Sequence, residues 1–327
     1  MSKVYLFREF DRLNAAAALL LAKAFDPKKE LLVKIHFGEP GNKAALTPPD
    51  IAPIISALKQ LGLRPTLFDT PVAYNSPRNS VEGYRKVVKQ RGYNELAPSL
   101  ISDDFVETKA KDFVVQVAKP LAQASQVLVI SHVKGHYCAG FGGAIKNLAM
   151  GGVTKKTKSV EHSLGKPKWV DECEGCGLCA KQCPAQAIKI VEGKAVINLE
   201  KCWGCSICEV NCPSLAPQVA LFDDLLGQAA AAVIKNMPEK TFYINIIKNV
   251  TRFCDCESDG GAIVAKDVGV LFSDDPVAID RASIDLINKA EGRDVFKEEN
   301  FKDPKLQVDF TAQHLKASVD YNLVVVK

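Results

Sequence analysis

The sequence predicts an α/β protein, in which helices cover both faces of a mostly parallel sheet and a smaller cysteine-rich domain is inserted into the chain. Two observations support this expectation. Strand-like and helix-like segments alternate along both ends of the chain, a pattern typical of parallel sheets. Between them lies a stretch with eight of the eleven cysteines. The length of 327 residues fits two domains at about 100–200 residues each.

The individual elements follow from apolar spacing. Continuous apolar runs predict strands at 31–37, 65–69, 126–133, 241–248 and 267–272. Helical spacing predicts helices at 15–22, 48–61, 80–91, 218–237 and 276–290. Asp275 is expected to cap the last helix, with Pro276 at its first position. The two flanks are therefore expected to form one discontinuous domain, 1–165 with 217–327, around an insert at 166–216.

Composition excludes several classes of protein. Apolar residues make up 47% and charged residues 24% of the chain, as in ordinary globular proteins. The net charge of +4 is too small to indicate nucleic-acid binding, and no apolar run approaches a membrane-spanning length. The run Ala15–Ala22 is short for a signal peptide and follows several charged residues, so a helix of the fold is preferred and a cytoplasmic protein is expected.

The insert contains two cysteine runs with one spacing, C-x2-C-x2-C-x3-C-P. The first run contains Cys173, Cys176, Cys179 and Cys183, and the second contains Cys202, Cys205, Cys208 and Cys212. This spacing holds 4Fe-4S clusters in bacterial ferredoxins, where the fourth cysteine of each run binds the other cluster. Three thiolates on a tight loop cap three corners of the cube, and glycines let the backbone approach closely.

We therefore expect two 4Fe-4S clusters with crossed ligands. One set is Cys173, Cys176, Cys179 and Cys212, and the other is Cys202, Cys205, Cys208 and Cys183. A disulfide framework is disfavoured in the cytoplasm, and zinc sites favour separate C-x2-C pairs. Residues 166–215 resemble a bacterial ferredoxin module, which implies a small α+β ferredoxin-like domain.

Three blocks in the flanks resemble the DUF362 family. They are Val33–Asn42 (VKIHFGEPGN), His132–Leu148 (HVKGHYCAGFGGAIKNL), and Cys254-Asp255-Cys256 followed by Asp267–Leu271 and Asp275–Asp280. The resemblance spans almost the whole chain. It implies an iron–sulfur protein of anaerobic-type metabolism and does not supply a reaction.

Histidines and lysines in these blocks are candidates for catalysis. His36 and His132 fall at predicted strand ends, where parallel sheets bind ligands, and His136 follows in the next loop. Each would carry protons near neutral pH, although a lone histidine is more often structural. Lys34 and Lys134 flank the same predicted cleft, where either would position a carboxylate substrate or remain a solvated charge.

Two further groups lie in the same blocks. The Cys254-Asp255-Cys256 triplet is too tight for a disulfide to be the default, so its thiolates are candidates for an additional metal ion or for redox chemistry; the alternative is a loop with two buried free cysteines. One arrangement joins them to His132 and His136. Gly140, Gly142, Gly143 and Lys146 form a glycine-rich helix start that would suit an anion.

The preferred function is a redox enzyme. Electrons would pass between the two clusters and a substrate or metal site in the α/β domain, with a redox partner protein or a small-molecule substrate as partner. The alternative is a non-enzymatic electron carrier, or a protein that assembles a metal cofactor. A closed cleft containing His36, His136 and Cys256 would favour the enzyme over a flat docking surface.

Overall fold

An eight-stranded sheet forms the centre of the computed structural model, which describes residues 1–326. Its strands lie in the order β18 (Tyr321–Val326), β1 (Ser2–Phe7), β17 (Gly269–Ser273), β14 (Thr241–Ile247), β7 (Val127–His132), β2 (Glu30–Ile35), β3 (Arg64–Asp69) and β4 (Ser99–Ile101). Only β17 runs antiparallel to its neighbours. The prediction of a mostly parallel sheet is therefore confirmed.

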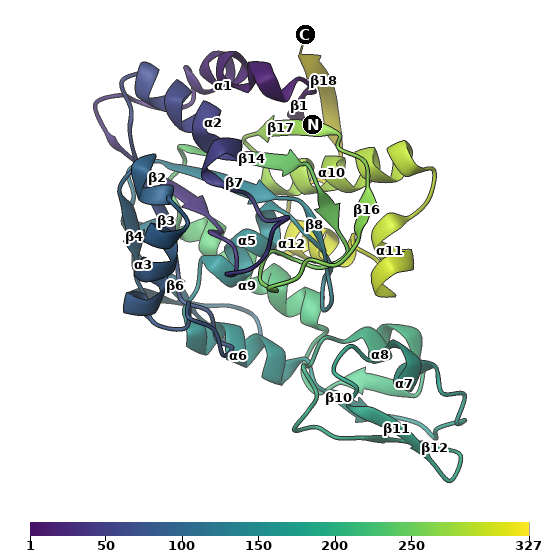
Figure 1. Cartoon of the computed structure of the whole chain (residues 1–327). Helices are drawn as coiled ribbons and strands as arrows, with labels where there is room; N and C mark the ends of the chain where they lie inside the picture. Colours follow the sequence, from purple (N-terminus) through teal and green to yellow (C-terminus); the bar gives the residue numbers. More distant parts are fainter. Residues whose placement is uncertain (327) are drawn as a thin grey trace.

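Helices cover both faces of this sheet (Figure 1). Strand β7 shows why, because Val127 and Val129 are buried in one core while Leu128 and Ile130 are buried in the other. One face is covered by α1 (Leu13–Leu21), α2 (Pro48–Gln60) and α3 (Val81–Gln90). The other is covered mainly by α4 (Lys119–Gln123), α5 (Ala144–Gly151), α9 (Phe222–Asn236), α10 (Pro276–Glu291), α11 (Val295–Asn300) and α12 (Leu306–Leu315).

The predicted helices form with small shifts at their ends. Asp275 caps α10, where its carboxylate accepts from the amides of Val277 and Ala278. Helix α9 begins at Phe222 rather than at Gln218, because the Gln218 amide bonds back to the carbonyl of Lys166. Strand β1 and the edge strand β18, which pair in parallel, were not among the predicted strands.

Short elements connect this frame. They are η1 (Phe10–Arg12), η2 (Tyr93–Glu95), α6 (Lys155–Leu164), and the two-stranded pairs β5 (Phe105–Lys109) with β6 (Val114–Ala118), β8 (Lys134–His136) with β9 (Gly140–Gly142), and β15 (Val250–Thr251) with β16 (Ile263–Ala265). No helix among residues 1–326 is both long and apolar enough to span a membrane.

The cysteine-rich segment forms a small unit beside the main body. This unit projects at the lower right of Figure 1. It contains β10 (Pro167–Trp169), α7 (Leu178–Gln182), β11 (Ile188–Val191), β12 (Lys194–Ile197), α8 (Ile207–Asn211) and β13 (Leu215–Pro217). Its two ends lie side by side, because Pro167 pairs with Pro217 across the β10–β13 ladder. It has a small apolar cluster of its own, while Cys205 and Ile207 pack into the core of the main body.

Candidate functional site

The candidate site lies at the carboxyl edge of the sheet, where strand order reverses. From β2 the chain proceeds outward to β3 and β4 and then returns to β7, on the other side of β2. Ligands of open α/β sheets bind at such a switch point. His36 directly follows β2, His132 ends β7, and the loop that carries Cys254 follows β14, the other neighbour of β7.

A pocket opens at this edge and brings together most of the predicted residues. It encloses about 520 Å³, including space open to solvent. Its lining includes His36, His132, Lys134, Gly142, Gly143, Lys146, Cys254 and Cys256. Gly140 and His136 do not line it, and His136 lies behind the two cysteines.

His136, Cys254 and Cys256 form a tight group. One ring nitrogen and the two Sγ atoms lie within 4.8 Å of one another, close enough for side chains that share a single metal ion. The two cysteines form a disulfide, with a Cα–Cα distance of 5.3 Å. The expectation of two free thiols is therefore wrong for this state of the protein, because the intervening residue loops out far enough for both side chains to meet.

His132 and Lys134 hold the disulfide loop in place. His132 bonds through Nδ1 to the Asp255 carboxylate at 2.8 Å and through Nε2 to the Lys248 carbonyl at 2.7 Å. The Lys134 ammonium lies 3.8 Å from Asp255. Burial alone would raise the pKa of Asp255, but His132 and Lys134 together hold it below its usual range. Both ring nitrogens of His132 are occupied, so its expected place among metal ligands is wrong, although it lines the pocket.

His36 is likewise held by its surroundings. Its Nε2 accepts from the Arg78 guanidinium at 2.8 Å, and Arg78 is itself paired with the Glu39 carboxylate. Burial lowers the pKa of His36 well below its usual value, and the nearby charge of Arg78 lowers it further. The expectation that His36 carries protons near neutral pH is therefore wrong, because its ring is neutral there.

The ring of His136 has a defined tautomer. Its Nδ1 accepts hydrogen bonds from the amides of Cys138 at 3.0 Å and Ala139 at 3.1 Å. Burial lowers the pKa of His136 well below its usual value, so the neutral ring carries its proton on Nε2. His136 therefore offers a donor, Nε2–H, on the side away from these amides. Like His36, it does not titrate near neutral pH, contrary to expectation.

Of the lysines at this edge, one is left without a partner. Lys34 is fully buried and paired with Asp69 at 3.0 Å, and Lys134 donates to the carbonyls of Ala44 and Asn249. Neither is a free substrate anchor. Lys146 lines the pocket, and its ammonium forms no hydrogen bond or ion pair with the side chains or backbone of residues 1–326. Burial lowers the pKa of Lys146 to about 8, so it is largely charged at neutral pH.

The glycine-rich helix start is already capped. The Asp280 carboxylate accepts from the amides of Ala144 at 2.7 Å and Ile145 at 2.9 Å. The expectation of free amides for an anion at this helix start is therefore wrong. A Cβ on Gly143 would lie 2.4 Å from an Asp280 oxygen. A glycine at this position therefore leaves room for the Asp280 carboxylate to reach the amides at the helix start. Gly142 and Lys146 remain at the pocket.

The eight cysteines of the small unit gather in two crossed sets. Burial is the main cause that raises the pKa of Cys179, and the neighbouring thiols that raise it further are Cys212, Cys173 and Cys176. The corresponding neighbours of Cys202 include Cys205 and Cys183. Thus Cys212 lies with the first run and Cys183 with the second. None of the eight forms a disulfide.

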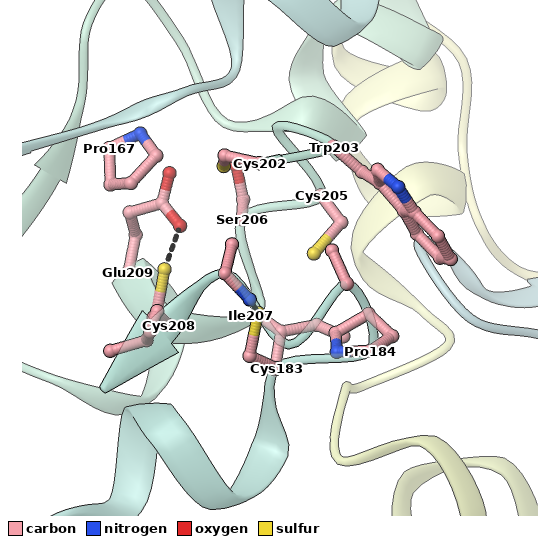
Figure 2. A pocket seen from close by; sticks show the side chains of 13 residues that line it. Pro167, Cys183, Pro184, Cys202, Trp203, Cys205, Ser206, Ile207, Cys208 and Glu209 are labelled. Atoms are coloured by element: carbon pink, nitrogen blue, oxygen red, sulfur yellow. Dashed lines mark hydrogen bonds between the residues drawn. The ribbon is translucent and has the colours of Figure 1, made fainter. Parts of the chain in front are cut away.

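The second set surrounds a pocket of its own. Cys183, Cys202, Cys205 and Cys208 all line it, as Figure 2 shows. The Cys208 thiol donates to Glu209 at 3.0 Å, the dashed contact in Figure 2. Apolar side chains such as Pro184 and Ile207 complete the wall.

The small unit meets the α/β body close to the candidate site. Cys138 and Cys205 lie close together in one buried cluster. The buried Lys302 ammonium donates to the carbonyls of both cysteines, at 2.7 and 2.6 Å. A second contact is aromatic, because Tyr137 stacks on Phe253 with centroids 3.8 Å apart and meets Trp203 edge-on at 6.0 Å.

Sequence reasoning missed several of these residues. Asp255 was visible between the two cysteines but was not recognised as an anchor. Arg78 and Lys302 lie outside every motif, and their importance follows only from burial and from the residues that the fold brings to them.

The fold and the site define an α/β protein with a histidine–cysteine group suited to metal or redox chemistry. The chain belongs to the DUF362 family, described as a domain of unknown function, which its residues 31–285 match. No curated protein matches the sequence. Two solved structures are similar in part. A protein from Thermotoga maritima is 9% identical over 87% of this chain and 59% of its own, with a TM-score of 0.47. The lactate racemase apoprotein from Thermoanaerobacterium thermosaccharolyticum is 12% identical over 75% of this chain and 50% of its own, with a TM-score of 0.37. The chain thus spans less than two thirds of either protein.

Proposed function

We propose that this protein is an iron–sulfur oxidoreductase of the cytoplasm. In this proposal residues 166–216 form an inserted ferredoxin-like domain with two 4Fe-4S clusters, and the α/β domain, 1–165 with 217–327, receives the electrons at its pocket. Each cluster, when bound, carries one electron at a time, and the chain supplies its thiolates and sets its surroundings.

The crossed arrangement of the cysteines is the observation that carries the proposal. The motif requires the fourth cysteine of each run to serve the other cluster, and Cys212 and Cys183 lie accordingly. Backbone amides point at the sulfurs of Cys173, Cys183 and Cys202, each at 3.3 Å. Such N–H donors stabilise thiolates that bind iron. Iron binding by Cys208 would replace its bond to Glu209.

Glycine positions support the same fit. Gly175 and Gly204 have φ of +72° and +60°, where side chains are strained. A Cβ at Gly175 would lie 1.9 Å from the Gly193 carbonyl, and one at Gly204 would lie 1.8 Å from that of His162. These loops are therefore as tightly folded as the motif requires.

Exposure gives the two sets different roles. In the first set Cys176 is exposed, whereas in the second set Cys205 and Cys208 are buried and Cys205 contacts the α/β domain. We assign the first set to a redox partner at the surface and the second to the pocket.

The acceptor in this proposal is a small anionic substrate. Lys146 supplies an unpaired positive charge beside the disulfide, and the pocket's carboxylate, Asp255, is already neutralised by His132 and Lys134. An additional metal ion on His136, Cys254 and Cys256 is the alternative acceptor, and it would require the disulfide to open first. A pocket of this composition favours an enzyme over a non-enzymatic carrier or an assembly protein.

Electron paramagnetic resonance tests this function. Anaerobically purified protein reduced with dithionite should show two one-electron centres per chain. A chain that binds zinc in these sites and gives no signal would refute the proposal.

A further inference from the structure

The disulfide at the pocket has the surroundings of a reaction centre. Cys254 is buried and Cys256 is partly exposed, and both line the open pocket. Their loop is fixed by the buried Asp255 and by the hydrogen bond from the Glu39 amide to the Asp255 carbonyl at 2.8 Å. A reductant or substrate in the pocket therefore reaches a disulfide whose backbone is already held in place.

The surroundings also suit the reduced state of the pair. The Cys256 amide points at the Cys254 sulfur at 3.4 Å. One ring nitrogen of His136 lies within 4.8 Å of both sulfurs, and we assign this position to Nε2–H as the second donor, because Nδ1 is occupied by two amides. Hydrogen bonds to the charged form favour a thiolate.

The same tautomer disfavours a metal ion here. A metal ion on Nε2 needs the ring proton on Nδ1, and that proton would face the amide hydrogens of Cys138 and Ala139. A metal ion on Nδ1 would displace both amides. A thiolate accepting from Nε2–H requires no such change.

A short connection leads from this pair to the small unit. The His136 ring lies beside the two sulfurs, and the Cys138 amide donates to it. Cys138 lies in the same buried cluster as Cys205, one of the second set of cysteines. Lys302 binds the carbonyls of both Cys138 and Cys205, so this contact is fixed from both sides.

We infer that Cys254 and Cys256 form a redox-active disulfide that collects two electrons at the pocket, with His136 as hydrogen-bond donor to the thiolate formed at Cys254. The S–S bond breaks when the pair takes up two electrons and one proton, which leaves a thiolate on Cys254 and a thiol on Cys256. The electrons come singly from reduced iron–sulfur centres by way of Cys205 and Cys138, and the proton comes from solvent in the pocket. Reoxidation releases both electrons and the proton. The electron source rests on the proposed function, whereas the disulfide chemistry does not.

Trypsin provides a specific readout. Cleavage after Arg252 and Lys266 gives the peptide 253–266, which contains Cys254 and Cys256 and no other cysteine. The whole protein is equilibrated in dithiothreitol buffers of defined potential, alkylated with iodoacetamide and digested. The peptide should change from no label to two labels in one reversible transition. A peptide that stays labelled throughout, or resists the reductant throughout, would overturn the inference. So would a metal ion bound by the reduced pair.

The role of His136 has its own test. In His136→Phe the equilibrium should shift toward the disulfide by at least about tenfold, since a hydrogen bond to a charged sulfur is lost. His314→Phe, which alters a histidine bonded to Asp224 on the far helices, should leave the equilibrium unchanged. Equal values in both variants would remove His136 from the inference.

A one-electron donor separates the two proposals. Reduced methyl viologen should open the disulfide of the wild type, so that iodoacetamide then labels the peptide. The same labelling should appear at least about tenfold more slowly in Cys183→Ser. Dithiothreitol should reduce both proteins alike. If both donors act alike on both proteins, the connection through Cys205 is wrong. If the protein holds no iron but still shows the dithiothreitol transition, the proposed function fails and the redox-active disulfide stands.

Discussion

Cys138 of the α/β domain lies near Cys205 of the cysteine-rich unit, and both belong to one buried cluster. Their sequence positions are 67 residues apart, and the buried Lys302 joins their backbones. This contact places the second cysteine set directly behind the loop of His136. It also makes the cysteine-rich unit part of the pocket's surroundings rather than a separate attachment.

Paired substitutions test the crossed ligands. Cys212→Ser should damage the cluster of Cys173, Cys176 and Cys179, and Cys183→Ser should damage the other, because each serine replaces a thiolate that reaches across. Electron paramagnetic resonance of the reduced variants distinguishes the two clusters. The crossed assignment would be contradicted if Cys212→Ser damaged only the cluster of Cys202, Cys205 and Cys208. That contradiction equally requires Cys183→Ser to damage only the cluster of Cys173, Cys176 and Cys179.

Lys34 should matter for stability rather than for binding. Lys34→Met leaves the buried Asp69 carboxylate without its cation, which typically costs about 3–5 kcal/mol. Urea unfolding measures the loss. Lys86→Met breaks an exposed pair with Glu82 and should leave stability nearly unchanged, because solvent screens such a pair. Similar losses in the two variants would mean that burial is not the cause.

Lys146 should select negatively charged reagents. With the disulfide reduced, iodoacetate should label peptide 253–266 faster, relative to neutral iodoacetamide, than it labels free cysteine. Lys146→Met should lower that ratio at least severalfold, and Lys189→Met, an exposed control on β11, should not. A ratio unaffected by Lys146→Met would exclude an anion site at this lysine.

The same ratio should depend on pH. The pKa of Lys146 is about 8, so its charge is present below that pH and is lost as the pH rises through it. The preference for iodoacetate should therefore fall between about pH 7 and 9. Thiolate formation affects both reagents equally and cancels. A preference that rises over this range would contradict the assignment.

The α/β domain should retain its fold without residues 166–216. Gly165 joined to Pro217 by a short flexible linker should give a soluble protein with the same helix content, because Pro167 and Pro217 lie side by side. Its stability should be lower, because Cys205 and Ile207 leave the main core. Circular dichroism and thermal melting measure both. An aggregated or molten product would show that the insert is part of the core.

The sequence was sufficient for the frame because its signals are local. Apolar spacing identified β2, β7, α2 and α10, and the cap by Asp275 followed from one Asp-Pro pair. Strands β1 and β18 were missed because each depends on a partner far away in the chain.

The site was predictable only in part for the same reason. The strand ends placed His36 and His132 at the correct edge, but their roles depend on partners such as Arg78 and Asp255. Helix capping by Asp280 involves a residue more than 100 positions away from the amides it binds. Such contacts leave no periodic signal in a single sequence.

The central claim is that two 4Fe-4S clusters occupy the crossed cysteine sets. The most direct measurement is the amount of iron, acid-labile sulfide and zinc in anaerobically purified protein. The account predicts about eight iron and eight sulfide per chain, four of each from every cluster, and no stoichiometric zinc. Zinc in place of iron, or a protein without sulfide in which the eight cysteines are paired as disulfides, would contradict it.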